Sequence, residues 1–536
     1  MPEIDKFEMP PVAVVRLHLE PVLQELSLPV RLLSFGEEPD NQIKLVTSVG
    51  STSQKPYAAL SHCWGKHQPL RTTTSNISQM MQEIEWSILP AVFQDAIKVC
   101  RRLDIKLLWI DSLCIIQDDT RDWEVESAQM ANYYEHARIT IYAASSVDSS
   151  QPFLRDRAKR WLPRRFELLD AANPQYSIIA REYPRYEMPE DSERLNTRAW
   201  AWQEAVLSTR IIVYGQSGIT WVCKSGTTAE DGTTGQRTDG ASMALGVLGA
   251  AGTPGTWESI IHSPVLASEN EEDTQALVES WWRLIRSFSN RALAYPTDRL
   301  PAMSGVASRI KPRLSGGYLA GLWRKHLVES LCWIRAPPEV DELPYASTEY
   351  VAPSWSWASI TSGVYHGPSS IKNFVSKVDI LEASCFVPGL NELGKVSSGQ
   401  LVLKGKTTKI FLTNKNPLIW VGYHLEDRKH SSRSQDVTRD GELVHIDCVL
   451  TMISKNHRIC RAQDDKQGRR RLSGMICALL LGEDYPPKES DDGKRTEYVM
   501  LLGQSEDEEA FHRLGIVAMN DDRLFQGAKE ELVRIV

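Results

Sequence analysis

The sequence has few features that would tie the protein to a membrane or to a secreted, disulfide-bonded class. Its nine cysteines include no CxxC pair, and an odd, widely spaced set is typical of reduced thiols inside a cell. No run approaches the ~20 apolar residues of a membrane-spanning helix. The N-terminus is acidic and interrupted by prolines, unlike a signal or transit peptide. We therefore expect a cytoplasmic protein without membrane insertion.

The sequence also lacks an excess of positive charge and a glycine-rich phosphate loop. The formal net charge is -8 and the sequence pI is about 5.9, which argues against a nucleic-acid groove as the main binding surface. Neither a P-loop nor a GxGxxG motif is present. A bound pyrophosphate would therefore have to rest on a helix N-terminus, such as the one expected near Thr120.

What the sequence does contain, in its first part, is an alternation of strands and helices. Short apolar runs at 57–61, 107–110 and 138–144 predict buried strands. The segment 89–103 has the apolar spacing of a helix. Asp118, Asp119 and Thr120 offer N-cap chemistry for a second helix that extends to about Ala137. This β-α-β-α-β order predicts an α/β domain with a parallel sheet flanked by helices.

The pattern changes twice beyond residue 195. A helix at 196–207 precedes strands at 210–214 and 219–223, and a Gly/Thr-rich stretch at 224–257 predicts a mobile insertion. The remaining expectations are amphipathic helices near 274–288 and 318–333, and then strand-like runs: SWSWAS (354–359), QLVLKG (400–405), LVHIDCVLTMI (443–453), MICALLLG (475–482), YVMLLG (498–503) and RLGIVAM (513–519).

Three sequence blocks together resemble the fungal heterokaryon-incompatibility (HET) domain. They are YAALSHCWG at 57–65, the segment from LPAVFQDAIKVC to ITIYAAS at 89–145, and LNTRAWAWQEAVLSTRIIVYG at 195–215. Their order and spacing are specific, and the resemblance covers about residues 30–225. The sequence departs from the usual pattern at His62, Ala199 and Trp202, positions that bear on the geometry of a site.

The resemblance implies a domain organisation and a distant relationship. The HET domain is distantly similar to the Toll/interleukin-receptor (TIR) fold, which implies a TIR- or flavodoxin-like α/β domain with insertions. The expected order is an N-terminal extension (1–29), the HET domain (30–225), a flexible insertion (226–270), a helical connector (271–345) and a β-rich C-terminal domain (346–536).

The stretch SHCWG holds several side chains with catalytic chemistry. Adjacent residues on a strand point to opposite faces, so we do not expect Ser61 and His62 to pair as nucleophile and base with Asp111. The GxSxG motif of many serine hydrolases is missing as well. His62, Cys63 and His67 lack the paired spacing of a zinc site, so we expect no metal there and predict that Cys63 is a buried apolar residue.

Carboxylates are the stronger candidates for chemistry. Asp111 follows a buried strand, at the edge where open α/β sheets bind ligands. In TIR-type hydrolases a helix glutamate stabilises the positive charge that develops on ribose when NAD loses nicotinamide, and Glu126 is the residue that we match to it. NAD would then be a substrate, and no cofactor is expected. The residues expected to bind this substrate are Ser61, Trp64, Gly65 and Trp109.

Each of these residues also has a structural alternative. Glu126 could be an ordinary helix glutamate, and Asp111 could cap the turn that follows it. Glu204 is a rival acid, unless it only forms an ion pair with Arg198 or Arg210. Tryptophans are more often core residues than ligand contacts, and Gly65 fits a turn that needs a positive φ angle or a close approach.

Three functions remain open from the sequence. The HET resemblance implies a regulator or effector of nonself recognition and programmed cell death, which assembles with itself or with another fungal incompatibility protein. The TIR resemblance implies an NAD nucleosidase that uses a glutamate carboxylate. The third function is an accessory role in a metabolic gene cluster.

Overall fold

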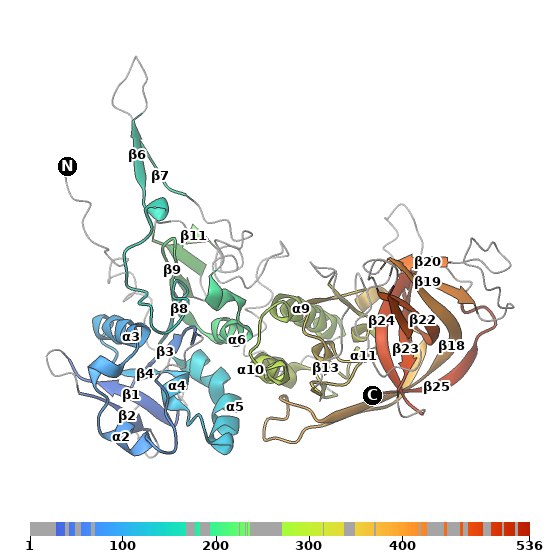
Figure 1. The fold of residues 1–536 in the computed structure, drawn as a ribbon, viewed down its shortest axis with the longest axis horizontal. Helices are drawn as coiled ribbons and strands as arrows, with labels where there is room; N and C mark the ends of the chain where they lie inside the picture. Colours follow the sequence, from blue (N-terminus) through green and yellow to red (C-terminus); the bar gives the residue numbers. More distant parts are fainter. Residues whose placement is uncertain are drawn as a thin grey trace. The chain divides into compact units, whose positions relative to one another are not determined.

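The protein, seen in a computed structural model, falls into two units, residues 1–261 and 262–536. Figure 1 shows the fold and labels many of the helices and strands of both units. Each unit has a hydrophobic core of its own. The residues that the structure describes are 28–37, 42–48, 55–65, 70–167, 177–182, 193–223, 226–230, 232, 234–235, 271–314, 316–336, 349–368, 371–416, 420–425, 444–447, 461–464, 470–485, 495–505, 509–519 and 524–536.

A nine-stranded sheet organises the first unit, in the order β11-β10-β9-β8-β5-β3-β4-β1-β2. Strands β4, β3, β5 and β8 at its centre are parallel, and the strands on either side are antiparallel. The strands are β1 (Arg31–Phe35), β2 (Ile43–Thr47), β3 (Ala58–Ser61), β4 (Leu107–Trp109), β5 (Ile139–Tyr142), β8 (Arg210–Tyr214), β9 (Ile219–Cys223), β10 (Gly226–Ala229) and β11 (Thr234–Gly235). A separate hairpin pairs β6 (Arg164–Glu167) with β7 (Ser177–Ala180).

The predicted parallel sheet is confirmed at its centre and is wrong at its edges, so the sheet is mixed. Strands β8 and β9 are joined by residues 215–218 alone. A connection this short can join only antiparallel neighbours, because a parallel pair needs a crossover of about a dozen residues or more. Strands β10 and β11 also lie inside the stretch predicted to be an insertion, whereas 236–257 lies outside the described residues.

Three α-helices of the first unit were predicted from the sequence, namely α3 (Ala91–Arg102), α5 (Thr120–His136) and α6 (Ala199–Leu207). Two short ones, α2 (Ile77–Gln82) and α4 (Asp111–Cys114), were not predicted. Helix α3 buries the predicted apolar face, which includes Val92, Phe93 and Ala96. The N-cap of α5 is Asp119, whose carboxylate accepts hydrogen bonds from the backbone N–H groups of the first turn.

The second unit begins with helices and corrects one prediction. Helix α9 (Glu271–Ser289) confirms the helix expected near 274–288, and α10 (Pro301–Ile310) was not predicted. The helix expected near 318–333 is wrong, because Gly317, Ala320, Gly321 and His326 have positive φ angles that an α-helix of L-residues does not contain. That segment forms β12 (Tyr318–Leu319), β13 (Leu322–Trp323) and α11 (Leu327–Ser330), and β14 (Trp333–Arg335) follows.

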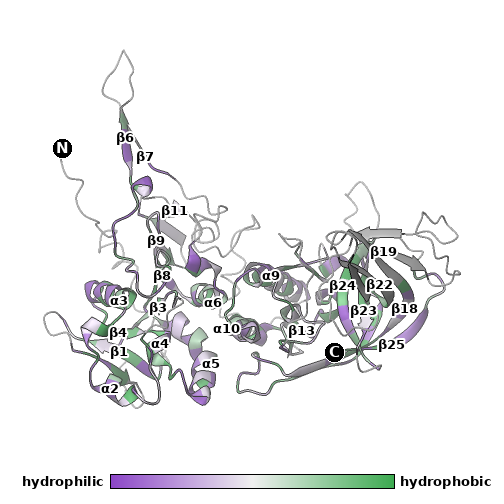
Figure 2. Cartoon of the chain, viewed as in Figure 1, coloured by the Kyte–Doolittle hydropathy of each residue, from purple (hydrophilic) through white to green (hydrophobic). Residues whose placement is uncertain are grey.

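A ten-stranded sheet forms the β-rich part of the second unit, as predicted. Its long strand β18 pairs with both β22 and β25, so the sheet closes on itself. Figure 2 shows β23 and β24 as hydrophobic strands, in agreement with their buried side chains. The strands are β16 (Phe374–Ser376), β17 (Val378–Phe386), β18 (Ser398–Asn416), β19 (Trp420–Leu425), β20 (Val444–Asp447), β21 (Arg461–Asp464), β22 (Arg470–Asp484), β23 (Thr496–Gln504), β24 (Phe511–Met519) and β25 (Lys529–Ile535); β15 (Val364–His366) pairs with β14.

The strand predictions for this part are confirmed with two qualifications. QLVLKG, MICALLLG, YVMLLG and RLGIVAM lie in β18, β22, β23 and β24, and part of LVHIDCVLTMI forms β20 while 448–453 lies outside the described residues. The prediction of a strand at SWSWAS is wrong. This segment forms a turn and a short 3-10 helix at Trp357–Ser359, capped by the Ser356 hydroxyl. Among the described helices, none combines the length and the apolar composition needed to cross a membrane.

The carbonyl oxygen of Gly321 links two indole rings of the second unit. Its carbonyl oxygen accepts hydrogen bonds from Nε1 of Trp281 and of Trp357, each at 2.9 Å. Its φ angle is +95°, and a Cβ atom at this position would lie 2.4 Å from Trp357 Nε1. Glycine is therefore required at this position for two reasons, the positive φ angle of the backbone and the lack of space for a Cβ atom.

We expect Gly321→Ala to lower the free energy of unfolding of the second unit by about 2–4 kcal/mol, because overpacking adds to the cost of a positive φ angle. Gly317→Ala is the matched control. Its φ angle is +99° and nothing lies within 4 Å of the added Cβ, so only the backbone cost of about 1 kcal/mol should appear. Denaturant unfolding measures both values, and equal losses would contradict the packing argument.

Candidate functional site

The candidate site lies where the central parallel strands of the first unit end. Ser61 is the last residue of β3, and Asp111 begins α4 just after β4. Arg198 precedes α6, and Glu204 lies within it. The carboxyl ends of parallel strands meet at one edge of a sheet, and this edge brings together residues from three separate parts of the sequence.

Glu204 is a buried acid at the centre of this edge. Burial raises the pKa of its carboxyl from 4.5 to about 7, and the negative charge of Asp111 raises that pKa as well. The hydroxyls of Ser61 and Tyr134 and the Arg198 guanidinium lower it. Ser61 Oγ lies near the Glu204 carboxyl, although it has no hydrogen-bond partner of good geometry among the described residues. A carboxyl that exchanges its proton near neutral pH is suited to acid–base chemistry.

Asp111 is held in place by its neighbours and remains partly accessible. Its Oδ2 accepts a hydrogen bond from Trp64 Nε1 at 2.8 Å, and its Oδ1 accepts one from the backbone N–H of Ser112 at 2.7 Å. Its side chain is 19% exposed. Asp111 is the first residue of α4 and not its N-cap, which is Ile110, so the expected capping role is not what holds it. Its carboxylate is fixed by Trp64 and Ser112 and lies at the edge of the sheet.

Ser61 and His62 turn toward different helices. The His62 ring packs edge-on against Phe93 of α3, with 5.1 Å between ring centroids, whereas Ser61 lies beside Glu204 of α6. The Nδ1 atom of His62 is 4.0 Å from Asp111 Oδ1. Burial nevertheless lowers the pKa of His62 to about 4, so its imidazole is neutral at pH 7. This arrangement does not form a Ser-His-Asp triad.

Glu126 belongs to a second, separate cluster. Its carboxylate is 1% exposed, accepts a hydrogen bond from Tyr133 Oη at 3.1 Å, and lies 4.0 Å from Nη2 of Arg31. Arg31 is itself bound to Asp122 and to the carbonyl oxygen of Cys114. Burial raises the pKa of Glu126 to about 6, and Arg31 opposes the shift. The contacts of Glu126 thus tie α5 to β1, and they do not include Asp111 or Ser61.

The other predicted site residues have packing roles. Trp109 is fully buried against Tyr133 and Tyr134, so a ligand could reach it only if the core opened. Gly65 has a φ angle of +88°, and an added Cβ would lie 2.4 Å from Asp148 Cβ, which confirms both reasons expected for this glycine. Cys63 is buried, and burial raises the pKa of its thiol. His67 lies outside the described residues.

Several buried polar atoms at this edge have no hydrogen-bond partner among the described residues. They follow the ends of three adjacent parallel strands, β4, β3 and β5, and a native protein leaves few such groups unpaired. Bound water or a polar ligand would satisfy them. These atoms are Ser112 Oγ, Ser61 Oγ, His62 Nε2, Ser145 Oγ and Ser146 Oγ.

The N-terminus of α5 does not offer the expected resting place for a pyrophosphate. The Asp119 carboxylate already accepts hydrogen bonds from the backbone N–H groups of Arg121 (2.9 Å) and Asp122 (3.2 Å). A second anion would meet this negative charge. Any phosphate at the candidate site would therefore need the arginines near Cys63, which are Arg194 and Arg198.

A third buried acid, Glu193, was missed by sequence reasoning. Burial raises its pKa to about 7, and it accepts hydrogen bonds from the backbone N–H of Gln216 at 2.7 Å and from the side chain of Asn196. Asn196 in turn accepts one from Tyr142 Oη at 3.0 Å. This network ties the end of β5 to the β8–β9 turn. No local pattern could reveal it, because its members come from distant segments.

The raised pKa of Glu204 predicts a pH-dependent stability. The folded protein binds the Glu204 proton more tightly than the unfolded chain, so this stabilisation is full below about pH 4.5 and is lost as the pH rises through about 7. Glu204→Gln has no proton to lose. We expect its free energy of unfolding, relative to the natural chain, to rise by about 3 kcal/mol between pH 4.5 and 8.

Denaturant unfolding across this pH range measures the difference. Glu83→Gln, which changes an exposed glutamate of the same unit, should show a small difference that does not vary with pH. If the free energies of unfolding of Glu204→Gln and of the natural chain changed equally with pH, the raised pKa of Glu204 would be contradicted.

A known family model covers the residues at this edge of the sheet. Residues 57–204 match the family model described as "Heterokaryon incompatibility protein (HET)". The match includes Ser61, Asp111, Glu126, Arg198 and Glu204, whereas β1, β2 and the strands from β8 onward lie outside it. No curated protein and no solved structure matches the chain. The chain therefore contains a heterokaryon-incompatibility (HET) domain at residues 57–204.

Proposed function

We propose that this HET-domain protein acts in fungal heterokaryon incompatibility, as a regulator or effector of nonself recognition that leads to programmed cell death. The observation that carries the proposal is the family match at 57–204. The partner would be a second copy of the chain or another incompatibility protein of the same fungus.

Expression in a filamentous fungus tests this role. We expect inducible expression of the natural chain to arrest growth and kill cells, and Glu83→Gln, an exposed substitution, to do the same at equal protein levels. Cell viability and protein abundance are measured together. Normal growth of cells that contain abundant folded protein would count against the proposal, whether or not the protein has an enzymatic activity.

A second candidate function, an NAD nucleosidase, is favoured by the environment of Glu204. The distant TIR similarity of the HET domain suggested a glutamate carboxylate for this chemistry, with Glu126 as the first choice. Glu204 is the better choice, because it lies with Asp111 and Ser61 at the carboxyl edge of the sheet, whereas Arg31 and Tyr133 engage Glu126.

The proposed reaction is hydrolysis of NAD, in which the carboxylates of this chain and one water molecule take part. The bond between the ribose C1′ and the nicotinamide nitrogen breaks, and its electron pair leaves with nicotinamide. The ionised Glu204 carboxylate stabilises the positive charge that develops on the ribose and accepts a proton from the attacking water. The water oxygen bonds to C1′, and the products are nicotinamide, ADP-ribose and one proton. Asp111 would hold a ribose hydroxyl.

Release of nicotinamide from NAD by the purified chain tests this second function. Since the active form carries an ionised Glu204, we expect the rate to rise with pH through about 7. Glu204→Gln should lower the rate by about 100-fold or more, and Glu126→Gln by less than about 10-fold.

Both variants need a check of their fold by circular dichroism, and Glu83→Gln is the control with an unchanged rate. No nicotinamide from a folded, assembled sample would refute the enzymatic function and leave the incompatibility role standing. A loss of activity in Glu126→Gln alone would return the catalytic role to Glu126.

A further inference from the structure

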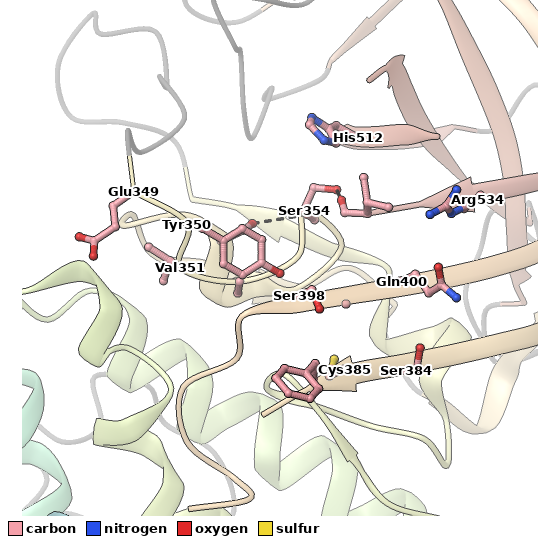
Figure 3. A pocket seen from close by; sticks show the side chains of 15 residues that line it. Glu349, Tyr350, Val351, Ser354, Ser384, Cys385, Ser398, Gln400, His512 and Arg534 are labelled. Carbon is pink, nitrogen blue, oxygen red and sulfur yellow. Dashed lines mark hydrogen bonds between the residues drawn. The ribbon is translucent and has the colours of Figure 1, made fainter. Parts of the chain in front are cut away.

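A cavity of about 770 Å³ lies within the second unit. Its volume falls in the range of pockets that hold small organic ligands, about 300–1,000 Å³. One wall is the segment 349–354, and the opposite wall consists of residues of β17, β18, β24 and β25 (Figure 3). All of these residues lie outside the HET match.

Hydrogen bonds fix the wall formed by 349–354. The backbone N–H of Ser354 donates to the carbonyl oxygen of Val536 at 3.1 Å, and Ser354 Oγ accepts from the backbone N–H of Arg513 at 3.0 Å. A Cβ atom at Gly399 would lie 2.4 Å from Pro353 Cγ, so glycine lets the segment lie against β18. The cavity is therefore formed before any ligand arrives, which lowers the entropic cost of binding.

Aromatic and apolar side chains line one part of the cavity. Tyr350 is 45% exposed and Phe386 is 63% exposed, and both rings border the cavity, together with Val351 and Cys385. Exposed aromatic rings that border a cavity offer surfaces on which a planar apolar group can pack. This part of the cavity therefore suits the planar apolar part of a ligand.

Polar groups gather on the opposite wall. In the strand register Gln400 pairs with Ser384, and Arg534 pairs with Val402, two residues along β18 from Gln400. Gln400 and Arg534 therefore share one face of the sheet, and Figure 3 shows them with His512 on neighbouring strands, across from Tyr350. An arginine has five donors, so it can bind a ligand carboxylate and keep its existing contacts.

We propose that this cavity is a binding site for a small aromatic carboxylate, with its ring between Tyr350 and Phe386 and its carboxylate at Arg534. The two kinds of lining decide the class. The aromatic rings favour a planar apolar body, and the guanidinium favours one negative charge placed at the end of that body. The second unit would thus bind a small ligand, and this binding goes beyond the incompatibility role proposed for the chain.

Calorimetric titration of the full chain with 2-naphthoate tests the site, and 2-naphthalenemethanol serves as the uncharged analogue. We expect saturable binding of one 2-naphthoate per chain below about 1 mM. Arg534→Met should weaken 2-naphthoate binding about tenfold or more and leave binding of the alcohol unchanged. Phe386→Ala should weaken both about three- to tenfold, through the lost ring contact.

Leu532→Ala is the matched control, since Leu532 lies on the same strand as Arg534, is 65% exposed and does not border the cavity. Its affinities should equal those of the natural chain. Should Arg534→Met fail to fold, Phe386→Ala carries the test, because its side chain is mostly exposed. Absence of saturable binding by the natural chain, or an unchanged 2-naphthoate affinity in folded Arg534→Met and Phe386→Ala, would overturn the proposal.

Discussion

The burial of parallel strands on both faces is the constraint on which the first unit depends. Every side chain of β3 and β5 is buried, so a polar side chain within these strands needs a buried partner, as Thr140 has in the Ser208 hydroxyl at 2.7 Å. The other polar groups stand at the strand ends. Asp111 and the buried hydroxyl of Ser61 stand at such ends, and Glu204 reaches the same edge from α6. The gathering of these polar groups at one edge of the sheet is thus a consequence of how the core is packed.

Helix α5 separates the acids of this domain into two environments. Tyr133 and Tyr134 are consecutive, so their side chains leave the helix about 100° apart. Tyr133 donates to Glu126, in the cluster that contains Arg31, whereas Tyr134 lies beside Glu204. After burial, the largest influence on the pKa of Glu126 is the cation Arg31, which lowers it, whereas the largest influence on the pKa of Glu204 is the anion Asp111, which raises it and outweighs Arg198. Two buried glutamates therefore differ in what they can do.

The second unit depends on a different constraint, which is the packing of indole rings against tight turns of the backbone. Gly321 accepts hydrogen bonds from the rings of Trp281 and Trp357, and it leaves room for the Trp357 ring only because it has no side chain. Gly399 plays the same part beside the cavity, where it lets Pro353 approach β18. In both places an absent side chain determines the shape of the surroundings.

Local properties of the chain could be predicted from its sequence, because they depend on neighbours along the chain. The strands at 57–61, 107–110 and 210–214, the cap at Asp119 and the turn at Gly65 all follow from apolar runs, a capping carboxylate and a glycine. The helix expected near 318–333 failed for a local reason as well, since apolar spacing alone does not reveal the positive φ angles of residues such as Gly321 and His326.

Tertiary structure alone decided how β1 joins the sheet and which residues form the site. Sequence spacing could not reveal that β1 would pair antiparallel with β4, or that Glu204 would join Asp111 and Ser61 while Glu126 joined Arg31. The reason is physical. The sequence by itself determined which residues are polar and which strands are buried, but the distances between residues 61, 111 and 204 are set by how α5 and α6 pack against the sheet.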